Sequence, residues 1–146
     1  MAHYFLLEEL KTELYQDFDV NKQLGMRIKS VRPYLYVNGT VSGNFRVALF
    51  FNSSEIATTA TFTAAEVKAS INTANSYCAV NYFKNLINPV FLKKGAYQIK
   101  LLSTGYTYSP NDFIAWIMEH EDIKNEMSYT PVNDLENSFA FDLFRF

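Results

Sequence analysis

The sequence is poor in cysteine and in net charge. It contains one cysteine, Cys78, and its 13 basic and 15 acidic residues leave a formal net charge of −2. One cysteine cannot form a disulfide within the chain, so we interpret Cys78 as a small buried hydrophobe and expect packing to stabilise the fold. The weak net charge argues against nucleic acid as a principal partner, because phosphate binding depends on many lysines and arginines.

Long apolar runs are also absent. No stretch approaches the roughly 18 apolar residues that cross a bilayer, and the first five residues lack the basic region, apolar run and cleavage site of a signal peptide. We therefore expect a soluble chain that neither enters a membrane nor carries its own secretory signal. Without a secretory route, the sequons at Asn38 and Asn52 are expected to form turns rather than to carry glycans.

Catalytic chemistry has few candidate residues. Only His3 and His120 have an ordinary pKa suited to acid and base catalysis near neutral pH. His120 lies between Glu119 and Glu121, but a helical zinc motif would need a second histidine at position 124, which is a lysine. No glycine-rich phosphate loop, nucleophile elbow or Cys-x-x-Cys pair is present. The sequence therefore predicts a protein that is not an enzyme and holds no cofactor, with Glu119 and Glu121 as a catalytic pair the weakest alternative.

A metal site is indicated only by a short acidic pattern. Asp17 and Asp19 place two carboxylates on one face of an expected strand, where a further oxygen ligand could complete a calcium site. The Asp-x-Asp pattern is common in proteins that bind no metal, and solvated carboxylates beside a buried Phe18 are the favoured interpretation. We therefore predict no metal site.

What the sequence does contain is apolar alternation. Hydrophobic residues make up 49% of its 146 residues and aromatic residues 16%, which is enough for one packed domain. Residues 44–51 and 97–101 alternate apolar and polar side chains with period two, as half-buried strands do. Further strands are expected at 15–20, 26–37, 55–62, 77–83 and 137–146, with a strong turn signal at Asn38-Gly39. This number of short strands predicts an antiparallel β-sandwich.

Two segments are harder to assign. Leu6, Leu7, Leu10 and Leu14 recur at helical spacing, which favours a short amphipathic helix. We expect residues 1–14 to form an N-terminal arm, helical or extended, and residues 15–146 to form the sandwich domain.

In the second segment, Ser109 and Pro110 are suited to begin a helix, whereas the six apolar residues that follow Asp112 also describe a buried strand.

The two ends of the chain are the predicted assembly surface. Each end carries apolar side chains that a small domain would bury only against something else. The predicted interface residues are Leu6, Leu7, Leu10, Leu14, Phe139, Phe141, Phe144 and Phe146.

Aromatic residues supply a second candidate surface. Exposed rings stack on sugar faces or anchor protein interfaces, because they bury a large area at a small cost in entropy. The candidate stacking residues are Tyr34, Tyr36, Tyr106, Tyr108 and Trp116, and packing in the core is the alternative for each of them.

Five segments share a pattern with a known family. Residues 15–20, 28–31 and 42–49 resemble the opening strands of galactose-binding-like jelly-roll domains. Leu92, Gly95 and Tyr97 are similar to the Leu-x-x-Gly-x-Tyr strand of that family, and residues 105–116 to the segment that follows it. The likeness extends over residues 15–119 and favours a strand at 110–119. It implies an all-β fold, an antiparallel jelly-roll β-sandwich with a short N-terminal helical or extended arm.

The same resemblance implies a role. Domains of this kind occur among the structural proteins of tailed bacteriophages, so we expect a virion protein that decorates the capsid or assembles the neck or tail. Its partners would be other virion proteins and further copies of itself. The alternative is a carbohydrate-binding module or adhesin domain that recognises glycans of the host surface, although no residue matches a defined sugar-binding motif.

Overall fold

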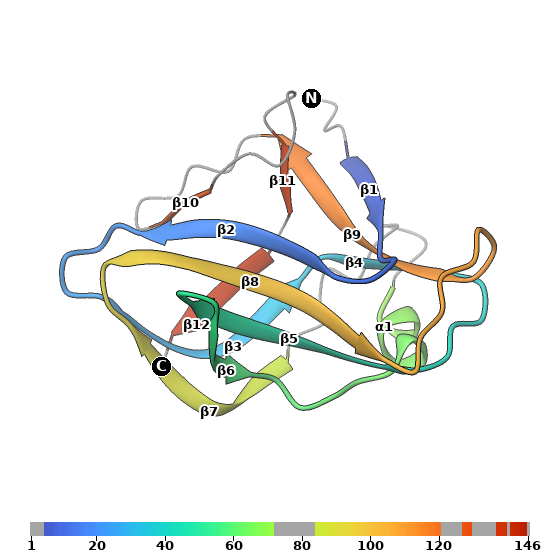
Figure 1. Cartoon of the computed structure of the whole chain (residues 1–146), viewed down its shortest axis with the longest axis horizontal. Helices are drawn as coiled ribbons and strands as arrows, with labels where there is room; N and C mark the ends of the chain where they lie inside the picture. The colour runs from blue at the N-terminus through green and yellow to red at the C-terminus, as the bar shows by residue number, and fades with distance from the viewer. Residues whose placement is uncertain (1–4, 72–83, 121–126, 130–136, 140, 146) are drawn as a thin grey trace.

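The computed structural model describes residues 5–71, 84–120, 127–129, 137–139 and 141–145, which form an antiparallel all-β sandwich (Figure 1). The predicted fold class is therefore confirmed at the level of a β-sandwich. The elements in chain order are β1 (Phe5–Glu9), β2 (Leu14–Val20), β3 (Met26–Pro33), β4 (Leu35–Asn38), β5 (Asn44–Phe51), β6 (Ser54–Thr58), α1 (Ala64–Ala69), β7 (Lys84–Leu92), β8 (Gly95–Thr104), β9 (Phe113–His120), β10 (Met127–Tyr129), β11 (Asn137–Phe139) and β12 (Phe141–Arg145).

One layer is a five-stranded sheet in the order β10-β2-β8-β5-β6, here called the β8 sheet. The predicted alternation holds in β5, where Phe45, Val47 and Leu49 are fully buried. Directly opposite residues of antiparallel strands point to the same face, so Leu49 and Val47 meet Ile99 and Leu101 of β8 on the inner face. The front of the sandwich in Figure 1 is this sheet.

The second layer is divided between two sheets. The β3 sheet has the order β12-β3-β7, and the β9 sheet contains β1, β9, β11 and β4. Pro33 ends β3, and β4 begins two residues later in the other sheet. At this bend the Ile117 N–H donates to the Tyr34 carbonyl oxygen at 2.9 Å. Proline cannot donate to a sheet ladder, which suits its position as the last residue of β3.

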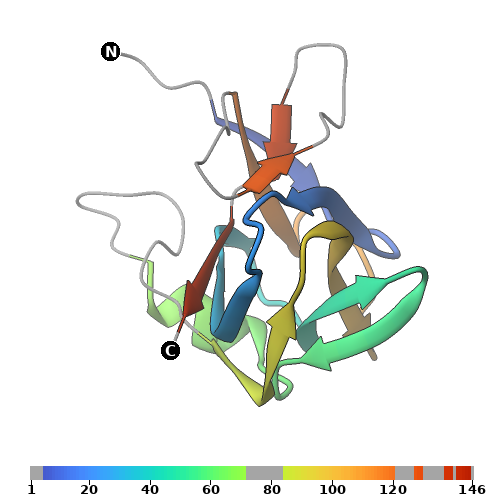
Figure 2. The same cartoon turned by 90° about the vertical axis from the view of Figure 1, so that its left-hand side faces the viewer.

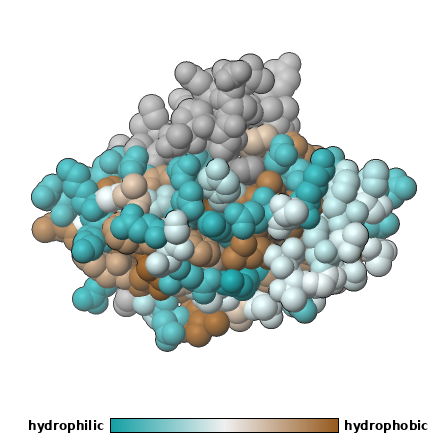
Figure 3. Space-filling view, in the orientation of Figure 1, coloured by the Kyte–Doolittle hydropathy of each residue, from teal (hydrophilic) through white to brown (hydrophobic). Residues whose placement is uncertain are grey.

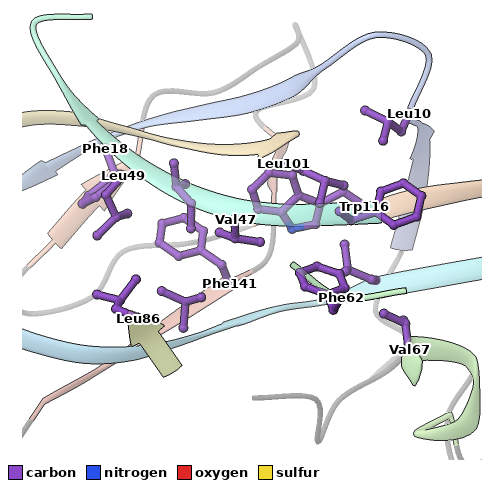
Figure 4. Close-up of a cluster of buried hydrophobic side chains, with 14 of the residues drawn as sticks. Leu10, Phe18, Val47, Leu49, Phe62, Val67, Leu86, Leu101, Trp116 and Phe141 are labelled. Atoms are coloured by element: carbon purple, nitrogen blue, oxygen red, sulfur yellow. The ribbon is translucent and has the colours of Figure 1, made fainter. Parts of the chain in front are cut away.

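Aromatic side chains join the two layers. The Phe141 ring of β12 lies 5.5 Å from Phe18 of β2 and 6.4 Å from Trp116 of β9, measured between ring centroids. All three side chains are buried, and Figure 4 shows them within one continuous cluster. Through the Phe141 ring, strand β12 is therefore packed against strands of both layers.

The helix predicted from Leu6, Leu7, Leu10 and Leu14 is wrong. Residues Phe5–Glu9 form β1, which pairs with β9, and the Leu10 N–H donates to the Ile114 carbonyl oxygen at 2.8 Å. So short a helix is marginal on its own, whereas the edge of β9 offers an existing ladder of backbone partners. The strand favoured at 110–119 is confirmed as β9, Phe113–His120.

Three elements, α1, β7 and β10, were not predicted from the sequence. The helix α1 begins after Thr63, whose hydroxyl oxygen accepts a hydrogen bond from the Glu66 N–H at 3.2 Å. Strand β7 has alternation that is interrupted, because Ile87, Asn88 and Pro89 are all exposed. The strand expected at 77–83 lies outside the described residues.

Candidate functional site

An aromatic and acidic surface lies on the outer face of the β9 sheet. Glu9 of β1 and Tyr36 of β4 lie on either side of Ala115 of β9, in one cross-strand row. Leu7 lies opposite Ile117 in a parallel row, and it is 40% exposed. Directly opposite residues share a face, and the small Ala115 lets the larger side chains on either side approach one another over it.

Three aromatic rings form a chain across this face. The Phe113 ring lies 6.3 Å from Tyr36 and 6.1 Å from Tyr108, measured between centroids. The Tyr36 hydroxyl donates to the Asn38 side-chain oxygen at 3.3 Å, which holds the first ring in place. All three rings are half-buried, so part of each faces solvent. We call Leu7, Glu9, Tyr36, Tyr108 and Phe113 the tyrosine surface.

Charged groups lie within the tyrosine surface. A hydrogen bond to the Glu9 carboxylate raises the pKa of the Tyr108 hydroxyl, because the bond favours the protonated phenol. The second carboxylate oxygen of Glu9, Oε2, is buried and has no hydrogen-bond partner among the described residues. The Lys11 ammonium lies 5.2 Å from the centroid of the Tyr108 ring, within the range of cation–π attraction.

The other predicted stacking residues lie elsewhere. Trp116 is 0% exposed, so its prediction as a sugar-stacking residue is wrong. Tyr106 packs edge-on against Phe45 at 5.3 Å, on the core side of the sheet. Tyr34 lies beside Arg32, whose guanidinium carbon is 5.1 Å from the ring centroid. Of the five, the structure therefore places Tyr36 and Tyr108 on one outer face together with Phe113, whereas the neighbouring Tyr106 packs its ring against the core.

The predicted terminal interface is also dispersed. Leu10 and Phe141 are buried in the chain's own core, so these two cannot serve as an exposed interface. Leu14 is half-buried against that core, Phe144 is half-buried with Arg32 5.5 Å from its ring centroid, and only Leu7 is exposed. Leu6 lies in β1 and Phe139 lies in β11. The side chains of these two residues, and the whole of Phe146, lie outside the described part of the structure.

A second surface, not predicted from the sequence, lies at the opposite end of the sandwich. The β2–β3 and β7–β8 connections meet there, at the left of Figure 1 and facing the viewer in Figure 2. Its apolar side chains are unusually exposed, with Leu24 at 82% and Phe91 at 55%. Hydrophobic and hydrophilic atoms lie side by side at this end in Figure 3. We call the following residues the cationic end: Lys22, Leu24, Arg27, Phe91, Lys93 and Lys94.

A shallow cleft lies on the outer face of the β8 sheet. It encloses about 210 Å³ and is lined by Asp17, Phe50, Gln98 and the β5–β6 turn. The Gln98 amide donates to Asp17 Oδ1 at 2.8 Å, and the Lys100 ammonium lies 4.5 Å from the Phe50 ring centroid. Within the described residues no three acidic, histidine or cysteine side chains are placed to hold a metal, Asp17 and Asp19 included.

The comparisons with known proteins add no relative. No family model, no curated protein and no solved structure matches the chain. In the part of the chain that the structure describes, no helix has the length and apolarity to cross a membrane. The class of protein is therefore defined by its fold, an antiparallel β-sandwich, and its role has to be argued from the two surfaces at its ends.

Proposed function

We propose that the chain is a structural protein of a tailed-bacteriophage virion, a jelly-roll subunit that acts by binding other subunits. The observation that carries the proposal is the exposed apolar group at the cationic end and along β7. Single exposed apolar residues are ordinary, but neighbouring ones mark interaction surfaces. Leu24, Phe91 and Ile87 leave 82%, 55% and 61% of their surface in contact with solvent.

The edge of the β3 sheet strengthens the proposal. Among the described strands, β7 forms a ladder with β3 alone, and a single bridge joins its Leu86 to Thr59. An open strand edge offers backbone donors and acceptors to an added strand. Ile87 and Pro89 lie on this strand, and proline is a residue that limits unwanted pairing at an edge. This edge therefore suits a specific, limited contact.

The test is to ask where the protein resides after infection. Particles of the phage that encodes the chain would be purified by density gradient and their proteins quantified by mass spectrometry. The proposal expects the chain at a fixed number of copies per particle, retained after a high-salt wash. Its presence only in the lysate, or its loss on washing, would end the proposal.

A second function is favoured by the tyrosine surface. Three half-exposed rings with an adjacent carboxylate are the chemistry that binds sugars, through stacking and through acceptance of hydroxyl hydrogen bonds. A glycan array would test it with the native chain and with Tyr108→Ala. The matched control is Tyr15→Ala, which removes a tyrosine that is 46% exposed on the other sheet. Glycan binding lost in Tyr108→Ala and kept in Tyr15→Ala would favour this function, and no binding to any glycan would count against it.

A further inference from the structure

The cleft on the outer face of the β8 sheet is bordered by one cross-strand row of side chains. Gln98 of β8 lies directly opposite both Asp17 of β2 and Phe50 of β5, three strands that run side by side in Figure 1. Directly opposite residues share a face of an antiparallel sheet, so these three side chains form one row. The next position on this face of β8 is Ala96, whose single methyl group leaves the space beside the row unfilled. A carboxylate, an amide and an aromatic ring therefore border one hollow of about 210 Å³.

The rim of the cleft is a tight turn. Phe51 and Ser54 lie directly opposite each other, so the connection between β5 and β6 consists of two residues, Asn52 and Ser53. Their φ values are +50° and +67°, and positive φ at both central residues is the geometry of a type I′ turn. A serine is more strained at the second position than the glycine that such turns prefer. The short turn therefore presents a preformed rim, and a ligand does not have to order it.

The polar side chains of the row leave acceptor oxygens free. The Gln98 Nε2 atom donates to Asp17 Oδ1 at 2.8 Å, which holds the two side chains together. Because the amide nitrogen faces Asp17, the Gln98 Oε1 atom remains an acceptor. Among the described residues no cation pairs with Asp17, and no group donates to Asp17 Oδ2 or to Gln98 Oε1. The ligand that satisfies these oxygens carries positive charge and donates several hydrogen bonds.

The Phe50 ring supplies an apolar wall beside these oxygens. The Lys100 ammonium lies 4.5 Å from the ring centroid and 3.5 Å from a carboxylate oxygen of Glu13. Lys100 occupies the row on the side of Phe50 away from Ala96, opposite Ala48, and it does not line the cleft. The ammonium therefore leaves the cleft side of the ring open, where a flat cation can stack.

We propose that this cleft binds a guanidinium group, the head group of an arginine side chain. The planar fork of the guanidinium would donate to Asp17 and to Gln98 Oε1 while its flat face lies along Phe50. An ammonium group has no flat face to stack, and an anion would be repelled by the Asp17 carboxylate. The site goes beyond the proposed assembly function and does not depend on it.

Size and surrounding charge agree with a single head group. Pockets that enclose drug-sized ligands have volumes of roughly 300–1,000 Å³, so this smaller cleft holds one group and leaves the rest of the ligand outside. Lys93 and Lys94 precede β8 at the turn, but both side chains are exposed and neither lines the cleft. Solvent and salt therefore screen these two lysines more than they screen a cation in contact with Asp17.

An NMR titration of the full isotope-labelled chain tests the site. The probe is N-acetyl-arginine amide, whose guanidinium is its only charge, and it should shift the side-chain amide signals of Gln98 and Asn52. We expect saturation with a dissociation constant in the millimolar range, as befits one exposed head group. N-acetyl-citrulline amide has the same shape without the charge, and it should bind about tenfold more weakly or less. The absence of a saturable shift up to about 50 mM probe, or equal binding of the two compounds, would overturn the inference.

Two variants of neighbouring carboxylates separate a contact from general attraction. Asp17→Asn keeps the shape of the side chain and removes its charge, and it should weaken binding of the arginine probe by about tenfold. The matched control is Asp19→Asn, which makes the same change of charge at the next position on the same face of β2 and lies outside the lining of the cleft. The control should weaken binding by less than about twofold. Equal weakening by the two variants would overturn the inference, and circular dichroism verifies that both keep the β-sheet spectrum.

The contribution of the ring is measured separately. Phe50→Leu keeps an apolar side chain and removes the flat face, so it should weaken binding of the arginine probe by about threefold or more. N-acetyl-lysine amide, which cannot stack, should bind the native chain more weakly than the arginine probe and should lose less affinity in Phe50→Leu. Tighter binding of the lysine compound than of the arginine compound would overturn the assignment to guanidinium.

The source of the guanidinium and the competing ligand class are distinguished in the same titration. Free arginine that binds no better than the blocked probe would show that the side chain alone is recognised, as on the surface of a partner protein. Binding about tenfold tighter would identify the free amino acid as the ligand, and either result supports the site. Hexoses are the competing class, because hydroxyl groups also donate to carboxylate and amide oxygens. Saturable binding of a hexose at Gln98 without binding of the arginine probe would overturn the inference.

Discussion

The Tyr106 hydroxyl donates a hydrogen bond of 2.7 Å to the backbone carbonyl oxygen of Leu10, which lies 96 residues earlier in the chain. The same residue of the β1–β2 connection donates its N–H to Ile114. Leu10 lies in the β1–β2 connection and Tyr106 lies in the β8–β9 connection. Each of these connections crosses from one layer of the sandwich to the other. This pair of bonds therefore fixes the end of the sandwich on which Lys11 and the tyrosine surface are placed.

We predict that Tyr106→Phe destabilises the chain by about 1–2 kcal/mol, because the Leu10 carbonyl oxygen loses its hydroxyl partner. The ring should remain packed against Phe45, so the loss reports the hydrogen bond rather than a cavity. Urea denaturation of the native chain and the variant measures the difference. The control is Tyr108→Phe, whose hydroxyl lies at the surface and whose loss should change the free energy of unfolding by less. Equal effects of the two changes would contradict this view of Leu10.

Alkaline pH should destabilise the fold. Burial raises the pKa of Tyr97 and of Tyr106 above the ordinary tyrosine value of about 10. Between the ordinary and the raised values the folded chain binds more protons than the unfolded chain, so the free energy of unfolding falls as pH rises. The contribution is intact below about pH 10 and is lost above it.

Urea denaturation from about pH 9 to about pH 11 measures this dependence. We expect the variant with Tyr97→Phe and Tyr106→Phe to start less stable at the lower pH and to lose less stability across the interval. A slope identical to that of the native chain would show that these two hydroxyls are not the groups responsible.

The single tryptophan should report on a closed core. Trp116 is fully buried between the layers. We predict blue-shifted fluorescence that acrylamide quenches weakly in the native chain and strongly after unfolding. Addition of sugars should leave the emission unchanged even if the tyrosine surface binds them. Strong quenching in the native state would mean that Trp116 is accessible and could stack on a ligand after all.

Gly39 is the glycine least able to accept a side chain. It has a φ of +75°, and a Cβ there would collide with the Asn111 carbonyl oxygen and with the Asp112 carboxylate. Asp112 accepts a hydrogen bond from the Thr40 N–H at 2.9 Å, so the β4–β5 and β8–β9 connections are close-packed at this point. We predict that Gly39→Ala costs about 2–3 kcal/mol, from strain and from separation of the two connections. Thermal unfolding measures it, with Gly105→Ala as the comparison, since a Cβ there has no neighbour nearer than 3.9 Å and only its φ is strained.

Much of the β8 sheet could be predicted from the sequence, because its strands bury one face and so alternate. Phe45, Val47 and Leu49 follow the pattern that period two predicts. Strand β1 could not be predicted in this way. Leu6, Leu7 and Leu10 also fit a helical spacing, and their true partner, β9, lies over 100 residues away. Pairing across such a distance leaves no local signal.

The candidate surfaces were harder to predict than the fold. The type of a residue does not determine whether its side chain is exposed. Trp116 and Phe91 are both aromatic, yet Trp116 is fully buried and Phe91 is mostly exposed. Two local signals were present and could have indicated the cationic end. Lys22 to Gly25 has the glycine of a tight turn, and Pro89 interrupts the apolar run of β7. Both indicate where the sheet ends, but only the folded chain places Leu24 beside Phe91.

The central claim is that the cationic end carries the protein into an assembled particle. The most direct measurement is competitive incorporation: the native chain and the variant with Leu24→Ser and Phe91→Thr are supplied in equal amounts during infection, and their ratio is measured by mass spectrometry in purified virions. The account predicts a particle strongly enriched in the native chain, with a control variant, Ile56→Thr on β6, incorporated as well as the native chain. Equal incorporation of the double variant would contradict it.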